Sequence, residues 1–321
     1  MRRIGILTSG GDAPGMNPAI RAVVRTAIAE YNLEVIGFYR GYLGLIEGQS
    51  VRLDLSSVSG ILNRGGTILK TARCEEFKTE AGQKKAVEQI SKLNLDGLII
   101  IGGNGTAHGA YLLANKWGVP VVQIPSTIDN DVAGTDFTIG FHTAVATATE
   151  AIDKLRDTAS SIERLFIVEV MGRDSGHIAL HTGLACGAEA ILIPEIEWSI
   201  EEVCNVLKAG EKRGKTSSII VVAEGVGSAV EIAKKIKDLI NYDTRVAVIG
   251  HLQRGGEPTP IDRILASKLG AKAVEVLYEG KKNILVGIES NKFSFHPINY
   301  AYEVKKNVDL DLYKLNKILA S

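Results

Sequence analysis

A repeated alternation constrains the fold of this chain more than any other feature. Short apolar runs end in glycine-bearing turns, and each turn leads into a stretch with helical periodicity. The turns read TSGGDAPGMN, GGNGTAHGA, VMGRDSGHI and AEGVGSAV. Continuous apolar strands that alternate with amphipathic helices are typical of α/β proteins with parallel sheets. The pattern therefore predicts α/β layers around parallel strands.

Length and the placement of the turns predict two similar α/β units. The chain has 321 residues, enough for about two domains. Two of the turns lie in each half of the chain. The expected strands are 4–8, 34–39, 97–101, 119–124, 165–170, 190–193, 218–223 and 245–250, and the expected helices include 18–30, 83–93, 143–158 and 200–213.

Composition excludes several classes of function. The 37 Lys and Arg residues equal the 37 Asp and Glu residues, so no broad attraction to nucleic acid or to an anionic membrane is expected. Cys74, Cys186 and Cys204 form no CxxC pair, which argues against a disulfide framework or a zinc site. The N-terminus MRRIGILTSGGD lacks the apolar core of a signal peptide, and no run approaches the ~20 apolar residues of a membrane span. We expect a soluble cytoplasmic protein with reduced thiols.

The turn TSGGDAPGMNPAI directly follows the first expected strand. Gly10, Gly11 and Gly15 allow a tight loop, and Asn17 followed by Pro18 predicts an N-cap and the first helical residue. A helix N-terminus presents free N–H groups that suit a phosphate. The loop lacks the Lys-Ser/Thr pair of a Walker A motif. A phosphate site and a plain tight turn both remain open at this point.

The second turn, GGNGTAHGA, loosely resembles a dinucleotide fingerprint. A Rossmann NAD site also has an acid about 20 residues further on. That window reads VPVVQIPS and contains no acid. The sequence therefore disfavours an NAD site here.

Acidic and cationic side chains follow later strands. Asp129 and Asp131 lie two residues apart in PSTIDNDVAGTD, so in an extended segment they share a face. Such a pair suits a general base with a metal or cation partner, although an Asx-rich turn explains it equally well. Arg173, His251 and Arg254 follow strands and suit an anionic ligand, with surface salt bridges as the alternative. Two phosphate-loop candidates, a carboxylate pair and several cations together suit phosphoryl transfer.

The chain resembles the bacterial type of the ATP-dependent 6-phosphofructokinase family nearly from end to end. The resemblance rests on LTSGGDAPGMN, GYLGL, RGGT, TAR, GGNG, TIDND, GTDFTIGF, EVMGR, GHLQRGG and DRILAS. It implies a homotetramer of chains with two Rossmann-like three-layer domains, mostly parallel sheets and a site in the cleft between them. The implied ATP-binding domain is 1–140 plus 253–303, and the implied fructose 6-phosphate domain is 141–252 plus 304–321. The implied reaction is the glycolytic transfer of phosphate from Mg²⁺-bound ATP to fructose 6-phosphate.

The resemblance also implies roles for individual residues. Asp129 would be the general base on the sugar 1-hydroxyl, while Arg173 and Thr127 would steady the transferring phosphoryl group. The implied ATP contacts are Gly11, Tyr42, Arg73, Cys74, Gly103, Asn104, Gly105 and Thr106. The implied sugar-phosphate contacts are Thr127, Asp129, Asp131, Met171, Gly172, Arg173, Glu224, His251 and Arg254, with Arg164 and Arg245 reaching in from a neighbouring subunit.

An effector site for ADP or phosphoenolpyruvate is implied with an incomplete set of cations. Leu55 stands where the family usually has arginine, and Thr216 and Ser217 replace a customary Lys-His pair. Fewer cations weaken the capture of a polyanion, so we predict a blunted effector response. The matching positions are Arg21, Arg25, Arg156, Gly187, Glu189, Arg213 and Lys215.

Two substitutions fall at the phosphate-binding turns. Asn104 replaces the family's metal-binding aspartate, and an uncharged amide predicts weakened Mg²⁺ handling. Ser126 stands where ATP users usually have glycine and pyrophosphate users lysine, while Gly105 keeps the ATP-type small residue. We therefore favour ATP over pyrophosphate. The alternatives are a low-activity or inactive paralogue that acts as a regulatory subunit and, less well matched, an NAD or diacylglycerol kinase.

Overall fold

The computed structural model describes residues 1–320 and contains two compact units. The first unit consists of Met1–Thr127, Asp131–His142 and Arg254–Lys306. The second consists of Ile128–Asn130, Thr143–Gln253 and the residues from Asn307 on. The chain therefore passes between the units at several points, two of them inside the TIDND segment.

The first unit is built on a seven-stranded sheet with the order β11-β10-β5-β4-β1-β2-β3. Its central strands are parallel, and the β2–β3 and β10–β11 pairs at the two edges are antiparallel. The strands are β1 (Arg3–Thr8), β2 (Glu34–Phe38), β3 (Ser50–Leu53), β4 (Gly97–Gly102), β5 (Val121–Pro125), β10 (Ile284–Glu289) and β11 (Lys292–Pro297).

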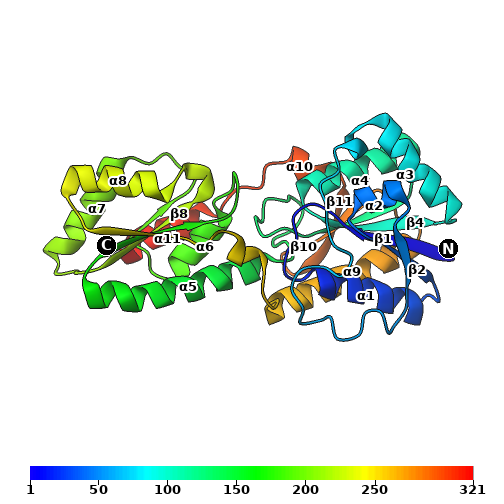
Figure 1. The fold of residues 1–321 in the computed structure, drawn as a ribbon, viewed down its shortest axis with the longest axis horizontal. Coiled ribbons are helices and arrows are strands. Elements are labelled where there is room, and N and C mark those ends of the chain that lie inside the picture. Colours follow the sequence, from blue (N-terminus) through cyan, green and yellow to red (C-terminus); the bar gives the residue numbers. More distant parts are fainter. Residues whose placement is uncertain (321) are drawn as a thin grey trace. The chain divides into compact units, whose positions relative to one another are not determined.

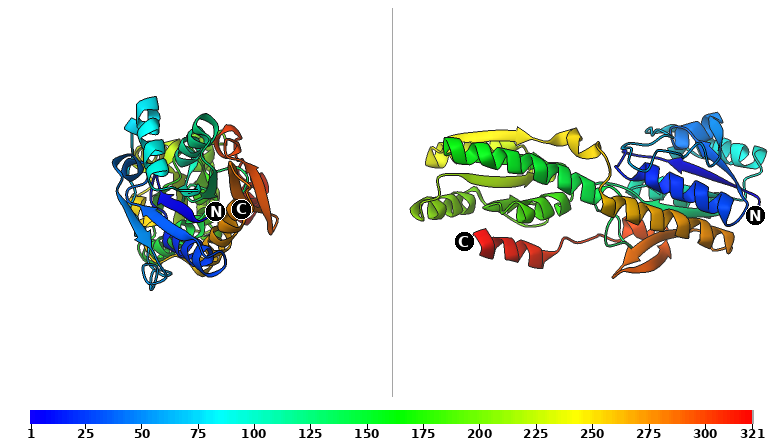
Figure 2. Two further views of the ribbon diagram at one scale, coloured as in Figure 1. Left: turned by 90° about the vertical axis from the view of Figure 1, so that its right-hand side faces the viewer. Right: turned by 90° about the horizontal axis from the view of Figure 1, so that it is seen from below.

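Helices cover both faces of this sheet (Figures 1 and 2). The helices α1 (Met16–Ala29) and α9 (Pro260–Tyr278) pack against each other on one face. The other face is covered by α2 (Tyr42–Glu47), α3 (Glu80–Lys92), α4 (Asn104–Trp117) and α10 (Tyr300–Glu303), with a 3₁₀ turn at Glu76–Lys78. Because β4 is sandwiched between these layers, all of its residues are buried, as its continuous apolar run predicts.

The second unit has a four-stranded sheet with the order β7-β8-β6-β9 and only parallel neighbours. The strands are β6 (Leu165–Val170), β7 (Ala190–Leu192), β8 (Ser218–Ala223) and β9 (Thr244–Val248). Apolar residues of α7 (Ile200–Lys212) and α8 (Ala229–Ile240) share one core with β6 and β8. The remaining helices are α5 (Phe141–Ile162), α6 (His177–Ala185) and α11 (Leu310–Ala320), and α6 contacts both α11 and the sheet.

The prediction of an α/β fold with mostly parallel sheets is confirmed. Each expected strand lies within two residues of an observed one at both ends, but the edge strands β3 and β11 and the strand β10 next to β11 were not predicted. β3 and β11 have few buried residues because edge strands face solvent on part of their surface. Among residues 1–320, no helix combines the length and apolar character that a bilayer span requires.

The predicted N-cap at Asn17 is wrong. Helix α1 begins at Met16, and its N-cap is Gly15, which supplies no side-chain cap. The Asn17 amide instead serves the neighbouring loop. Its Nδ2 donates to the carbonyls of Arg64 and Gly65 at 3.0 and 3.1 Å, and its Oδ1 accepts from the N–H of Ile68 at 2.8 Å. The asparagine therefore fixes the RGGT loop beside the helix, a long-range contact that local spacing does not reveal.

Candidate active site

The glycine turn after β1 lies against an arginine of the same unit. A Cβ on Gly11 would lie 2.4 Å from Nη1 of Arg254. The same Nη1 donates to the Asp12 carbonyl at 3.1 Å. Gly10 has φ of 84°, a backbone conformation that glycine adopts without steric cost. The structure thus brings Gly11 and Arg254 together, and a side chain at position 11 would displace the guanidinium.

The second glycine turn opens α4, beside the first turn. Gly103 is the N-cap and provides no side-chain cap, so the first N–H groups of α4 are available to a phosphate. Thr106 Oγ1 donates to the Ser9 carbonyl at 3.0 Å and ties the two turns together. The strands β1 and β4 that lead into the turns are parallel neighbours. Both turns therefore stand at the carboxyl edge of one sheet, where open α/β sheets bind ligands.

Tyr42 packs against the GGNGTAHGA turn and bonds to its backbone. Its hydroxyl donates to the Thr106 carbonyl at 2.7 Å, and its ring stacks on Phe77 with a centroid separation of 4.0 Å. Burial raises the pKa of Tyr42 well above its usual value. Cys74 is half-buried, and burial raises the pKa of its thiol too, whereas Arg73 is exposed. The predicted ATP contacts of these three residues stay a prediction.

Asn104, at the start of α4, bonds to a carboxylate. Its Nδ2 donates to Oδ2 of Asp131 at 2.9 Å and to the Asp131 carbonyl at 3.3 Å. Its Oδ1 is buried and has no hydrogen-bond partner within residues 1–320. The same part of the chain contains no cluster of three His, Cys, Asp or Glu side chains arranged to hold a metal ion. These residues fit a Mg²⁺ that arrives with phosphate oxygens as its main ligands.

Ser126 is buried beside the same turn. Its Oγ donates to the Ile139 carbonyl at 3.3 Å, and the two residues form an isolated parallel bridge. Thr127 next to it accepts a hydrogen bond at its carbonyl from Thr138 Oγ1 at 2.6 Å. The hydroxyl of Ser126 is therefore used to hold the segment that follows TIDND.

Lys306 is a residue that the sequence did not single out. Its Nζ donates to the Asp136 carbonyl at 2.8 Å. Burial lowers the pKa of Lys306 to about 8, against the opposing pull of the carboxylates of Asp136, Asp131 and Glu289. In the sequence it is one half of a Lys-Lys pair near the C-terminus, and such pairs usually lie in solvent. Only the tertiary fold brings it to the Asp131 side.

In the second unit, Asp129 is paired with Arg173. The Asp129 side chain is 3% exposed, and its Oδ2 lies 3.6 Å from Nε of Arg173. Arg173 has φ of 52°, an uncommon conformation for a residue with a side chain. Glu224 Oε1 holds this turn by accepting from the backbone N–H groups of Gly172 and Arg173 at 3.1 and 2.7 Å. The strained turn and its acidic support thus aim the guanidinium at the carboxylate.

Two further residues of the second unit hold this arrangement and were missed by sequence reasoning. Gln253 is fully buried, accepts from the Met171 N–H at 2.8 Å and donates to the Ala144 carbonyl at 3.3 Å. Ser175 Oγ donates to the Asp129 carbonyl at 3.2 Å. The signal for Gln253 was its place inside HLQRGG, between two predicted ligands. His251 itself is exposed.

The predicted subunit-bridging arginines meet at one carboxylate. Arg164 Nε lies 2.6 Å from Oδ2 of Asp243, and Arg245 Nη1 lies 2.6 Å from Oδ1 of the same residue. Asp243 was not predicted. It holds two guanidinium groups together just before β9, so a phosphate that binds them must compete with this carboxylate.

The predicted effector residues of the second unit are bonded to the protein itself. Lys215 Nζ lies 2.9 Å from Glu189 Oε1, and Arg213 donates to the Ala320 carbonyl at 3.4 Å. Arg156 bonds to the carbonyls of Cys186 and Gly187. In the first unit, Arg21 and Arg25 lie on α1 as predicted.

The chain is similar to known proteins of one family. The sequence profile described as Phosphofructokinase matches residues 3–277. Relatives described as ATP-dependent 6-phosphofructokinase in Halalkalibacterium halodurans and Bacillus cytotoxicus are 55% and 57% identical over 320 residues, which covers 100% of each chain. Among solved structures, the phosphofructokinase from Saccharomyces cerevisiae aligns with a TM-score of 0.89 and 33% identity, covering 99% of this chain and 46% of the yeast chain.

A pyrophosphate-dependent phosphofructokinase from Marinobacter aquaeolei aligns with a TM-score of 0.84 at 22% identity and covers 97% of this chain and 86% of its own. At that identity it supports the fold alone. The match to the family profile, together with relatives more than half identical from end to end, shows that this chain belongs to the phosphofructokinase family.

Proposed function

We propose that this chain is an ATP-dependent 6-phosphofructokinase, a glycolytic kinase of the cytoplasm. It transfers the terminal phosphoryl group of ATP to the 1-hydroxyl of fructose 6-phosphate and forms fructose 1,6-bisphosphate and ADP. The relatives that match it from end to end bear this enzyme's name, and none of them supports the alternative of an inactive paralogue.

The buried Asp129 carboxylate beside Arg173 is the observation on which the proposed chemistry depends most. With the sugar bound, Asp129 takes the proton of the 1-hydroxyl, the alkoxide oxygen bonds to the γ-phosphorus, and the bond from phosphorus to the ADP oxygen breaks. Arg173 lies 3.6 Å from Asp129 and offers its remaining N–H groups to the phosphoryl oxygens. Thr127, the first residue of the TIDND segment, helps to position the transferring phosphoryl group.

The glycine turns of the first unit hold ATP in this proposal. The uncapped N-terminus of α4 and the backbone of Gly11 meet the phosphates. Asn104 Oδ1 and Asp131 would hold a Mg²⁺ ion, which would supply positive charge against the phosphates. Because Asn104 is neutral, most of the opposing charge comes from ATP itself. We therefore assign ATP to the first unit and fructose 6-phosphate mainly to the second.

The effector response is proposed to be blunted. Arg156, Arg213 and Lys215 already bond to protein acceptors. An effector phosphate must displace those acceptors before it gains the same charge-assisted bonds, which reduces the net binding energy. We expect ADP and phosphoenolpyruvate to shift the fructose 6-phosphate curve only weakly.

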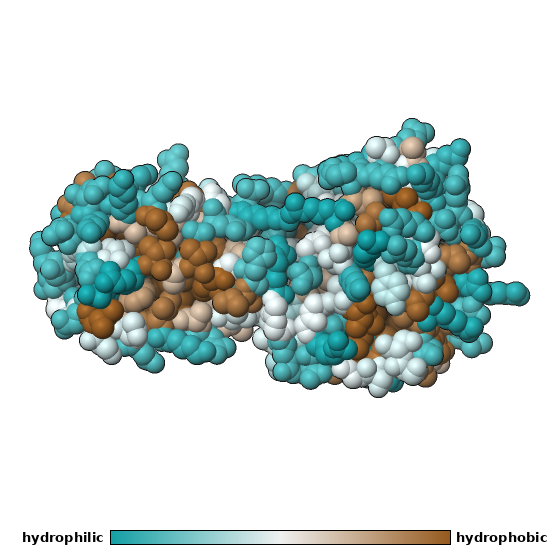
Figure 3. Space-filling view, viewed as in Figure 1, coloured by the Kyte–Doolittle hydropathy of each residue, from teal (hydrophilic) through white to brown (hydrophobic). Residues whose placement is uncertain are grey.

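A homotetramer is proposed from the resemblance and from exposed apolar surface. Figure 3 shows hydrophobic residues gathered over the β9 side of the second unit. Val248 of β9 is 57% exposed and Leu252 beside it is 72% exposed. The edge of β9 also has unpaired backbone groups, as the outer strand of the sheet. Contiguous apolar surface next to an open sheet edge suits a partner subunit.

The test is a coupled assay of fructose 1,6-bisphosphate formation with fructose 6-phosphate and either ATP or pyrophosphate. We expect ATP to support turnover and pyrophosphate to support at least tenfold less. No product with ATP under any Mg²⁺ concentration would refute the kinase assignment, and faster turnover with pyrophosphate would reverse the choice of donor. Sedimentation in the same buffer measures the oligomeric state.

A further inference from the structure

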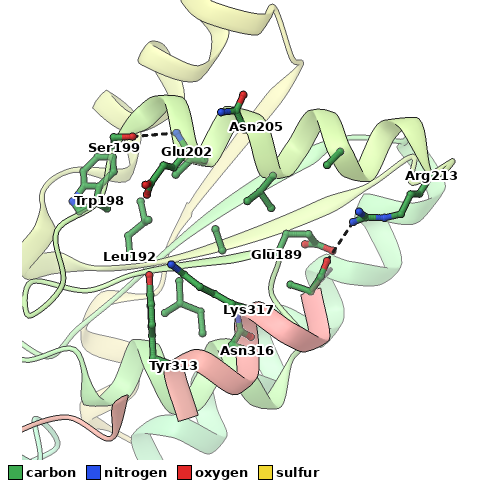
Figure 4. Close-up of a pocket in the computed structure, with 16 residues that line it drawn as sticks. Glu189, Leu192, Trp198, Ser199, Glu202, Asn205, Arg213, Tyr313, Asn316 and Lys317 are labelled. Carbon is green, nitrogen blue, oxygen red and sulfur yellow. Dashed lines mark hydrogen bonds between the residues drawn. The ribbon is translucent and has the colours of Figure 1, made fainter. Parts of the chain in front are cut away.

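The second unit contains a cavity that the proposed reaction does not use. It has a volume of about 420 Å³ and lies between α7 and α11, against the edge strand β7 (Figure 4). Ligand pockets of proteins typically measure 300–1,000 Å³. One end reaches Glu189 and Arg213, which belong to the predicted effector set. The rest of the cavity has no assigned role.

The interior of the cavity is mostly apolar. Ile191, Leu192 and Val203 form part of its lining and are each less than 5% exposed. Val206 on α7 lies on the same wall and is 37% exposed. Trp198 stands at the other end of the cavity from Arg213 and is partly buried against the core. The lining is mostly apolar and therefore favours a ligand with an apolar body, whose burial excludes water from those side chains.

The mouth of the cavity has one charge of each sign. Glu202 projects from α7, and Lys317 and Tyr313 project from α11, toward the same part of the cavity (Figure 4). Neither Glu202 nor Lys317 forms an ion pair within residues 1–320. Lys317 Nζ lies 5.1 Å from the centroid of the Tyr313 ring. Burial and the nearby Glu202 carboxylate both raise the pKa of Tyr313, which places that carboxylate close to the phenol.

We propose that this cavity binds a free α-amino acid with a large apolar side chain. The α-ammonium group bonds to Glu202 and the α-carboxylate bonds to Lys317, while the side chain lies between Trp198 and the wall formed by Leu192 and Val203. A zwitterion matches the two charges of the mouth with one ligand, whereas a simple acid or amine leaves one of them without a partner. The binding is independent of catalysis and is measured without ATP or sugar.

Trp198 provides the measurement. The chain has two tryptophans, so Trp117→Phe leaves Trp198 as the only one. We expect L-leucine, L-methionine and L-phenylalanine to change its fluorescence in a saturable way. Loss of one charge-assisted bond should weaken binding about tenfold, so 3-phenylpropanoate and 2-phenylethylamine should each bind about tenfold more weakly than L-phenylalanine. Equal affinity for 3-phenylpropanoate, or no saturable change with any amino acid, overturns the proposal.

Matched variants separate recognition from folding. Glu202→Gln and Lys317→Gln should each weaken L-phenylalanine binding about tenfold. Their controls, Glu201→Gln and Lys314→Gln, lie on the same helices but do not line the cavity, and they should bind as the parent does. Val206→Phe should block binding by occupying the cavity, whereas Val230→Phe on α8 should not, and neither variant adds a tryptophan to the fluorescence. Thermal unfolding without ligand shows whether each variant is folded, and weakening by a folded control equal to that of its partner overturns the assignment.

Discussion

Asp129 and Asp131 are the same residue type, two positions apart, yet they lie in different surroundings. Asp129 belongs to the second unit, is buried and faces the guanidinium of Arg173 at 3.6 Å. Asp131 belongs to the first unit, is partly exposed and accepts from the neutral amide of Asn104 at 2.9 Å. Asp129 thus faces a guanidinium in a dry setting, whereas Asp131 lies nearer water, where it accepts from an amide and interacts electrostatically with Lys306.

This difference is the reason why we propose different tasks for the two carboxylates. A buried carboxylate without its hydration shell is stable as an anion only with a cation or hydrogen-bond donors nearby, and Arg173 is such a cation for Asp129. A partly exposed carboxylate keeps access to hydrated Mg²⁺, which retains several waters when bound. We therefore propose that the two acids of the TIDND segment differ in role, with Asp129 in base catalysis and Asp131 in metal handling.

The largest expected effect comes from exchanging each acid for its amide. Asp129→Asn should lower kcat about 10³-fold at every Mg²⁺ concentration, because the general base is lost. Asp131→Asn should lower activity less, and high Mg²⁺ should restore part of it. The measurement is initial rate over a Mg²⁺ titration with both substrates saturating. If Mg²⁺ rescued Asp129→Asn and left Asp131→Asn unchanged, the two roles would have to be exchanged.

The second largest effect is expected from replacing Arg173, the cation beside Asp129. Arg173→Gln should lower kcat about 10²-fold, because one group that stabilises the developing phosphoryl charge is removed. Arg173→Lys keeps the charge but loses the planar guanidinium, so its kcat should lie between those of wild type and Arg173→Gln. His251→Gln, at an exposed predicted sugar contact, should instead raise KM for fructose 6-phosphate and spare kcat. A larger loss of kcat in His251→Gln than in Arg173→Gln would argue against this placement of the phosphoryl group.

The sequence predicts the buried strands and the local part of the site. The apolar run of β4 fixes the strand, and its glycines fix the turn that holds Asn104. The spacing of Asp129 and Asp131 identified both acids. It did not predict that they would belong to different units, because that depends on how the chain crosses between the sheets.

Long-range partners could not be predicted from local pattern. Asp243 joins Arg164 and Arg245 from distant segments, and Asn17 serves a loop 47 or more residues away. Gln253 has no distinctive spacing, yet it is fully buried and bonds to Met171. Each of these contacts is set by tertiary packing, and the periodicity of helices and strands carries no information about it.

A smaller effect is expected from Asn104→Asp, which removes the neutral partner of Asp131. Without Mg²⁺ the two carboxylates would repel at hydrogen-bond distance, so the variant should unfold about 2–4 °C lower for each kcal/mol of repulsion. With Mg²⁺ and ATP the added charge should reduce the Mg²⁺ concentration needed for half-maximal rate about five- to tenfold. Asn94→Asp, at a remote turn, controls for the change of net charge. An unchanged Mg²⁺ requirement would show that position 104 does not face the metal.

The smallest effect is expected from Lys306, the cation on the Asp131 side. Burial lowers its pKa from the ordinary 10.5 to about 8 in the folded protein. Between these two values the unfolded chain binds a proton that the folded chain does not, so this lysine makes stability rise as pH increases from 8 to 10.5.

Lys306→Gln removes that titration. The difference in unfolding temperature between wild type and Lys306→Gln should therefore shift in favour of wild type over this interval, by about 1 kcal/mol or a few degrees after solvent screening. Lys305→Gln, its exposed neighbour, should show no such shift. If the unfolding temperatures of wild type and Lys306→Gln changed in parallel with pH, Lys306 would be exposed to water. The amide of Asn104 would then be the main neighbour of the Asp131 carboxylate.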